Sequence, residues 1–202
     1  MRGFVALEAP EEVRALLGRV QEALRRSDAD VRWVGPDRLH LTLKFLGEIS
    51  EGQAQELEVL LRAEAQRWPP LSLVYAGVGA FPDHGVPRVV WAGVTGEIGK
   101  LSGLAAAIER AAEHVGVPRE GRPFVAHVTL GRVRSGRNAR GLQAAIEEQR
   151  QVPLGTSFVR EIVLFRSTLT PEGPVYDARA RIPLGGEPPG PPPPAVPEGR
   201  PL

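Results

Sequence analysis

Two histidines of this sequence, His40 and His127, are each followed two residues later by a threonine, Thr42 and Thr129. Aliphatic residues flank and separate each pair, and alternate side chains of a β-strand point to opposite faces. Each copy therefore predicts a strand that buries Leu or Val on one face and presents an imidazole and a hydroxyl on the other. One such short motif is weak evidence for a site, but the motif occurs twice and the chain has only four histidines.

Two imidazoles can serve as general acid and general base in one reaction cycle, because an imidazole titrates near neutrality. Displacement at a phosphodiester needs a base for the attacking hydroxyl or water, an acid for the leaving oxygen, and donors for the non-bridging oxygens. The hydroxyls of Thr42 and Thr129 can supply such donors. An in-line displacement places attacking and leaving groups on opposite sides of phosphorus, which suits two motifs related by two-fold symmetry. The pattern thus predicts phosphodiester chemistry.

Other kinds of site fit these residues less well. A metal site would need neighbouring carboxylates or a third histidine, and neither motif supplies one. A Gly-x-x-x-x-Gly-Lys phosphate loop is absent from the sequence, which argues against NTP-driven phosphoryl transfer. We therefore expect no metal and no cofactor. The remaining histidines, His84 in a loop rich in Gly and Pro and His114 in the last turn of a helix, are interpreted as structural.

The composition is that of an ordinary soluble protein. The 202 residues are 42% hydrophobic and 24% charged, and the net charge of +1 argues neither for nor against nucleic acid. Nearly all basic residues are arginines, whose planar fork suits phosphate oxygens, but for most of them we favour a GC-rich genome as the explanation. Cysteine is absent, and the N-terminal apolar run is too short for a signal peptide. We expect a cytoplasmic protein that contacts no membrane.

Periodicity indicates how these motifs are positioned. Helical spacing of apolar residues predicts long helices over 10–26, from 50 to before Pro69-Pro70, and over 98–116, and a short one around 142–146. Strands are expected at 4–7, 31–34, 39–46, 71–78, 88–94, 124–133, 158–165 and after the turn at 171–174.

The order helix, His-Thr strand, helix, strand occurs twice, which favours an α+β fold. We expect two similar lobes, each with an antiparallel sheet and helices, related by a pseudo-two-fold with the active-site cleft between them. Residues 1–184 would form a single bilobal domain with a lobe boundary near 95–99, where strand exchange between lobes is allowed. Residues 185–202 are dominated by Pro and Gly and predict a disordered tail.

The doubled His-x-Thr pattern resembles the 2H phosphoesterase superfamily, and more closely its RNA 2′,3′-cyclic phosphodiesterase branch, also called LigT-like or 2′-5′ RNA ligase. The resemblance covers residues 2–182. The segments that carry it are 2–7 with Pro10, 39–48, 87–94, 124–132 and 162–167 with Gly173 and Tyr176.

The resemblance implies hydrolysis of an RNA 2′,3′-cyclic phosphate to a 2′-phosphomonoester. It implies that His40 is the proton donor to the leaving 3′ oxygen and that His127 is the proton acceptor that activates water. It also implies slow ATP-independent 2′-5′ ligation in reverse. The expected partner is RNA or a nucleotide with a 2′,3′-cyclic phosphate, tRNA fragments included, and the expected state is a monomer.

Three further residues have two interpretations each. Arg132 matches a basic position of the family near the phosphate, but strict alternation puts it on the face opposite His127. Either a bulge at Gly131 resets the phase, which we favour, or Arg132 acts from the end of the strand. Phe45 has the same parity problem and is interpreted first as core and second as a base-stacking residue. Trp33, just before the first motif, has the same two interpretations, core or base stacking.

Two hypotheses compete with catalysis. A non-catalytic nucleotide- or RNA-binding module would keep both His-Thr pairs as phosphate donors and would bind without turnover. If the motifs were ordinary half-buried strands, the two histidines would point away from each other.

Overall fold

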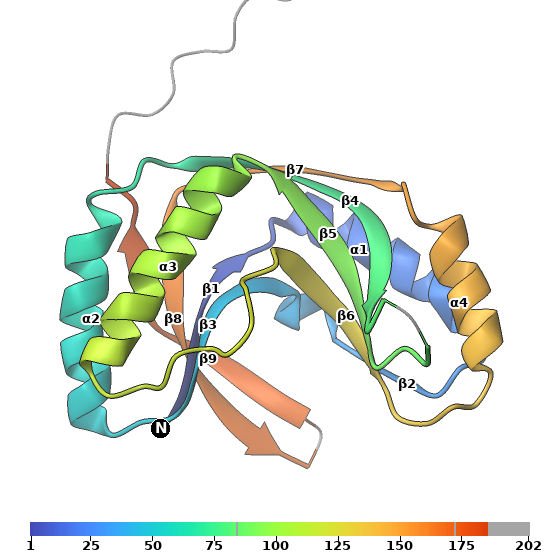
Figure 1. Cartoon of the computed structure of the whole chain (residues 1–202), viewed down its shortest axis with the longest axis horizontal. Helices are drawn as coiled ribbons and strands as arrows, with labels where there is room; N and C mark the ends of the chain where they lie inside the picture. The colour runs from blue at the N-terminus through green and yellow to red at the C-terminus, as the bar shows by residue number, and fades with distance from the viewer. Residues whose placement is uncertain (84, 172, 186–202) are drawn as a thin grey trace, which may run out of the picture.

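The computed structural model describes residues 1–83, 85–171 and 173–185, and within these residues the chain forms an α+β fold. Its strands join one curved antiparallel sheet, and its helices lie on the outer side of that sheet (Figure 1). The elements follow the order β1 (Arg2–Glu8), α1 (Glu11–Arg25), β2 (Val31–Trp33), η1 (Pro36–Arg38), β3 (His40–Glu48), α2 (Glu51–Ala65), β4 (Leu71–Phe81), β5 (Val89–Gly96), α3 (Ile98–His114), β6 (His127–Val133), α4 (Ala139–Glu148), β7 (Pro153–Val159), β8 (Glu161–Thr170) and β9 (Gly173–Pro183).

The two strands that carry the His-Thr motifs, β3 and β6, are neighbours in the middle of the sheet. The strand order is β7-β4-β5-β6-β3-β1-β8-β9, and β2 pairs with β6 off this path. Three strands therefore lie outside each motif strand: β5, β4 and β7 beyond β6, and β1, β8 and β9 beyond β3. This arrangement is the pseudo-two-fold expected from the repeated order of elements.

Helices exchange between the two halves of the sheet. The helix that precedes β3 in the chain, α1, packs on β7 and α4, whereas α3, which precedes β6, packs on β3 and α2. Each half of the sheet thus draws elements from both sides of residues 95–99. The assignment of residues 1–184 to one bilobal domain remains a prediction.

Local signals place the helix ends. The α2 helix begins with a capping box. The Ser50 hydroxyl accepts a hydrogen bond from the backbone N–H of Gln53, and the side-chain oxygen of Gln53 accepts one from the backbone N–H of Ser50. The α3 helix ends before Gly116, whose φ of +85° suits glycine at a helix C-terminus. Both ends agree with the predicted starts and stops.

The main core lies between the sheet and the helices, and a smaller cluster lies on the opposite face. Leucines of α1, α2 and α3, including Leu17, Leu57 and Leu104, are fully buried against the sheet. On the other face Phe4, Ala6, Val163 and Phe165 bury one another. The strand β1 is therefore apolar on both faces, which explains its unbroken run of hydrophobic residues.

The prediction of one continuous strand over 158–165 is wrong. The chain forms two strands there, which meet at Arg160: β7 pairs with β4 at one end of the sheet order, and β8 pairs with β1 and β9 near the other end. An apolar run that crosses from one half of the sheet to the other has the same periodicity as a single strand, so pattern alone could not separate the two.

Two predictions fall on residues that the structure does not describe: the loop position of His84 and the disordered tail from residue 186 onward. Gly185 is described, and its amide donates to the carbonyl of Ala65. His114 occupies the last turn of α3, as expected. Among the described helices, none combines the length and the hydropathy that a membrane span requires.

Candidate active site

The pairing of β3 with β6 brings the two His-Thr motifs onto one face of the sheet. Leu41 is paired with Val128 in this antiparallel ladder, and both side chains are buried on the helix side. Continuing that register places His40 opposite Thr129 and Thr42 opposite His127, on the other face. Diagonal neighbours in such a ladder are about 7–8 Å apart, so the two imidazoles flank a space comparable to one phosphate group.

Both imidazoles are held by the same kind of hydrogen bond. The Nδ1 atom of His40 lies 2.6 Å from the carbonyl oxygen of Arg38, and Nδ1 of His127 lies 2.7 Å from the carbonyl oxygen of Val125. A carbonyl can only accept, so Nδ1 carries the proton in each ring. The Nε2 atom of each ring is therefore the one that can take or give a proton.

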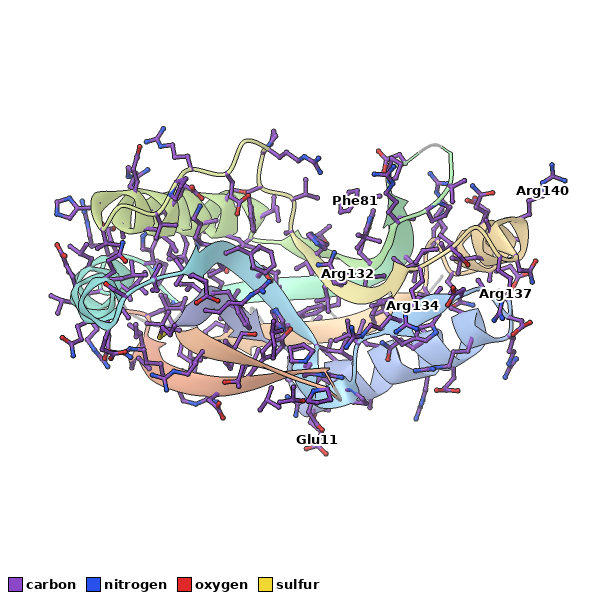
Figure 2. The ribbon with its side chains drawn as sticks, turned by 90° about the horizontal axis from the view of Figure 1, so that it is seen from below. Glu11, Phe81, Arg132, Arg134, Arg137 and Arg140 are labelled. Carbon is purple, nitrogen blue, oxygen red and sulfur yellow. The ribbon has the colours of Figure 1, made fainter. Side chains whose placement is uncertain are left out.

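A β-bulge in each motif strand adds a third residue to this face. In β6, Thr129 pairs with Trp91 and Gly131 pairs with Val90, which leaves Leu130 as the extra residue. The bulge expected near Gly131 is therefore present, one residue earlier, and Arg132 lies on the face of His127. Figure 2 shows Arg132 on the concave side of the curved sheet.

The bulge in β3 occupies the corresponding place. Thr42 pairs with Ala6 and Lys44 pairs with Val5, so that Leu43 is the extra residue. Lys44 consequently points to the helix side and Phe45 to the face of His40. The interpretation of Phe45 as a core residue is wrong: its exposed fraction is 55%, and its ring lies 6.3 Å from that of Phe4.

Polar side chains on the helix side are tied to both bulged segments. The buried Gln21 of α1 donates through Nε2 to the carbonyl oxygen of Leu130 at 2.9 Å and to that of Val34 at 2.8 Å. The buried Lys44 ammonium donates to Glu109 of α3 at 2.7 Å and to the carbonyl oxygen of Pro118 at 2.8 Å. A side chain of α1 thus binds the backbone at the bulge of β6, and a carboxylate of α3 pairs with the buried ammonium next to the bulge of β3.

Aromatic rings surround both histidines, and none of these rings was predicted from the sequence as a site residue. The ring of Phe4 stacks on His40 at 4.7 Å, and Tyr176 meets the same imidazole edge-on at 5.5 Å. On the other side Phe81 meets His127 edge-on at 5.4 Å and lies 5.2 Å from Trp91. The doubly apolar pattern of β1 was the available signal, because it indicates a strand covered on both faces.

Trp33 does not join the other candidate residues. It pairs with Gly131, whose missing side chain leaves space for the indole on the helix side, and it packs against the main core beneath Arg25. Its neighbour Arg32 pairs with Arg132 and therefore shares the face of the histidines. The structure thus brings an unassigned arginine to the site in place of the tryptophan.

Burial lowers the pKa of His40 below its ordinary value. The carbonyl of Arg38 and the carboxylate of Glu8 oppose this shift, and the second imidazole, His127, adds to it. Glu8 lies directly opposite His40 in the β1–β3 ladder and also accepts from Arg181 at 2.5 Å. The surroundings therefore favour the neutral ring until a negative charge approaches.

The described residues contain no group of three or more His, Asp or Glu side chains that could hold a metal ion. Two surface hollows lie away from His40 and His127. One is bordered by Gly136, Asn138, Arg140 and neighbouring residues, and the other lies between α2 and α3. Neither hollow includes a residue of the two His-Thr motifs.

The sequence matches the family model described as LigT like Phosphoesterase over residues 7–91 and 94–176. A curated relative from Methanothermobacter thermautotrophicus, named RNA 2′,3′-cyclic phosphodiesterase, is 36% identical over 87% of this chain and 95% of its own length. A relative of the same name from Thermus thermophilus is 35% identical over 93% of this chain and 92% of its own length.

Several solved structures are similar in fold to this chain. A crystal structure of a Thermus thermophilus protein aligns with a TM-score of 0.77 and 34% identity, over 93% of this chain and all of that one. The apo form of E. coli LigT aligns with a TM-score of 0.72 and 28% identity, over 92% and 98% of the two chains. E. coli LigT complexed with 3′-AMP aligns with a TM-score of 0.71 and 26% identity, over 91% and 97%.

Proposed function

This chain belongs to the LigT-like phosphoesterase family, and on that premise we propose that it hydrolyses RNA 2′,3′-cyclic phosphodiester ends to 2′-phosphomonoesters. The observation that carries the proposal is the register of β3 and β6, which sets two imidazoles with free Nε2 atoms diagonally across one face. The name shared by the curated relatives supports the choice of substrate.

The reaction uses the two imidazoles in opposite senses. Water attacks phosphorus and gives its proton to Nε2 of His127 as the new P–O bond forms. The P–O3′ bond breaks on the opposite side, and the leaving 3′ oxygen takes the proton from Nε2 of His40. Exchange with solvent returns both rings to their starting states. The same steps with an RNA 5′-hydroxyl in place of water would give a 2′-5′ linkage without ATP.

Three side chains stabilise the charge on the phosphate. The hydroxyls of Thr42 and Thr129 lie on the same face as the rings and donate to non-bridging oxygens. The guanidinium of Arg132 adds a fixed positive charge at the same edge. The exposed ring of Phe45, close to Phe4, offers a surface on which the terminal base can stack.

Binding of the substrate also changes the pKa of His40, the proposed proton donor. Burial lowers the pKa of His40 in the free protein, but an anionic phosphate beside the ring favours the imidazolium and raises that pKa again. A proton is therefore available where the leaving oxygen develops charge.

An assay of substrate and product tests the proposal. The protein is incubated with 2′,3′-cyclic AMP and with an RNA ending in 2′,3′-cyclic phosphate, both with EDTA present. The expected result is turnover in both cases, with 2′-phosphate as product and no loss of rate through chelation. Binding of either substrate without turnover would favour the non-catalytic module. A 3′-phosphate product would show that the 2′ oxygen, rather than the 3′ oxygen, is the leaving group.

A change at Glu8 tests which ring donates the proton. Glu8→Gln removes a carboxylate that favours protonated His40, so the pKa of His40 should fall further and a smaller fraction of rings should be protonated at pH 7. If His40 is the donor, kcat/KM at pH 7 falls, by about tenfold for each unit of pKa. The ring pKa is followed by NMR, and the rate is followed from pH 5 to 9.

The opposite assignment predicts a different outcome. A His40 that acts as the base is already mostly neutral, so Glu8→Gln would leave kcat/KM at pH 7 unchanged or raise it. Arg181 keeps its second partner, Glu161, at 2.6 Å, so the local strand pairing should survive the substitution. The control is Glu22→Gln, a change of the same type on the exposed side of α1.

A further inference from the structure

A row of arginines leaves the candidate active site along the chain that follows the second motif. Arg132 lies on the catalytic face of β6, and Arg134, Arg137 and Arg140 follow on the way into α4. Figure 2 shows these four side chains from the middle of the molecule to its α4 end. All four are exposed.

The start of the row concentrates positive charge at a cost to the fold. Arg32 and Arg132 are directly opposite each other in the β2–β6 ladder and share one face. Like charges in such a position destabilise a sheet. An anion bound between or beside the two guanidinium groups would remove that repulsion, so the pair is suited to a phosphate.

The rest of the row has few acidic partners. Within the described residues neither Arg134 nor Arg140 forms an ion pair, and Arg137 reaches Asp28 only at 3.5 Å with both side chains exposed. Such an exposed contact contributes little. On α2, by contrast, Arg62 pairs with Glu58 at 2.7 Å.

The two sides of the catalytic face differ in chemistry. Aromatic rings lie beside both histidines, but only next to His40 do three of them, Phe4, Phe165 and Tyr176, form one cluster among the described residues. Beyond His127 the face leads to the arginine row. A base and its sugar suit the aromatic side, whereas a chain of phosphates suits the row of guanidinium groups.

We propose that this arginine row binds the phosphates of the RNA strand upstream of the cyclic end, so that the preferred substrate is an oligonucleotide rather than a mononucleotide. The inference rests on the proposed function, because the row begins at the face where the cyclic phosphate reacts. Arginine recognises phosphate oxygens through charge-assisted, often bidentate hydrogen bonds. Binding of this kind is independent of sequence and weakens as salt rises.

Kinetics on two substrates of different length test the proposal. The double variant Arg134→Gln/Arg140→Gln is compared with the unmodified chain on 2′,3′-cyclic AMP and on a ten-nucleotide RNA with a 2′,3′-cyclic end. We expect kcat/KM on the RNA to fall by about tenfold while kcat/KM on the mononucleotide stays within twofold. The control Arg19→Gln/Arg110→Gln removes the same charge from exposed positions on α1 and α3 and should change neither.

Binding measured without turnover separates this inference from the proposed function. Anisotropy of a labelled RNA ending in 2′-phosphate is recorded over a range of salt concentrations. The slope of log affinity against log salt should become shallower by about 0.7 for each lost phosphate contact. An unchanged slope, or equal losses on both substrates, would overturn the role of the row. Absence of turnover in the unmodified chain, with the slope difference intact, would overturn only the proposed function.

Discussion

Replacing His127 with alanine should lower kcat/KM on 2′,3′-cyclic AMP by about 10²–10⁴, the usual contribution of one general acid or base. The ring is half-exposed and packs edge-on against Phe81, so its removal should leave the fold intact. Replacing His40 should cost a similar factor. Because Phe4 stacks on that imidazole, His40→Gln is the better variant, as it keeps more of the packing.

The double variant distinguishes a shared mechanism from two independent effects. If the rings act on one phosphorus, loss of either already disables proton transfer, and the double variant should lose far less than the product of the two single effects. The control is His114→Ala, which alters an exposed histidine at the end of α3. Full activity of either single variant would end the proposal of paired acid–base catalysis.

The second large effect is expected at Arg132. Arg132→Gln should lower kcat on the mononucleotide by about 10²–10³, with a smaller change in KM, because the guanidinium stabilises charge that develops in the transition state. Arg132→Lys should recover part of the rate, since a point charge replaces a planar fork. These rates are measured on 2′,3′-cyclic AMP, where upstream phosphates play no part.

A neighbouring arginine provides the matched control for that experiment. Arg134→Gln removes the same charge two residues further along, beyond the end of β6, and should leave the mononucleotide rate within twofold. If Arg132→Gln behaved like Arg134→Gln, the bulge at Leu130 would have no catalytic consequence.

The alternation of side chains was enough to predict that each motif presents its His and its Thr on one face of a strand. That both motifs share one face of a single sheet follows from the pairing of Leu41 with Val128. The face within each strand depends on local sequence, whereas this pairing joins distant segments of the chain and was not predicted.

The bulges could be predicted only in part, because a bulge depends on the partner strand. Gly131 indicated one near the second motif, and the structure has it at Leu130. No glycine marks Leu43, where β1 supplies one residue fewer than β3. The face predicted for Phe45 was therefore wrong. The face of Trp33 is set by its pairing with Gly131, which the sequence does not reveal.

The exchange of helices was also beyond local patterns. The spacing of apolar residues predicts that α1 and α3 are helices with one buried face, but not which half of the sheet each covers. Long-range packing decides this, and it also divides residues 158–165 between two distant strands. The aromatic lining of the site depends on the same pairings, since Phe4 meets His40 only through the β1–β3 ladder.

A crystal structure with 2′-AMP bound would test the central claim most directly, because it shows where the product phosphate lies. The account predicts a phosphate on the face of β3 and β6, with Nε2 of His40 and Nε2 of His127 both within hydrogen-bond distance of its oxygens. A phosphate held by only one of the two rings, or bound elsewhere on the chain, would contradict it.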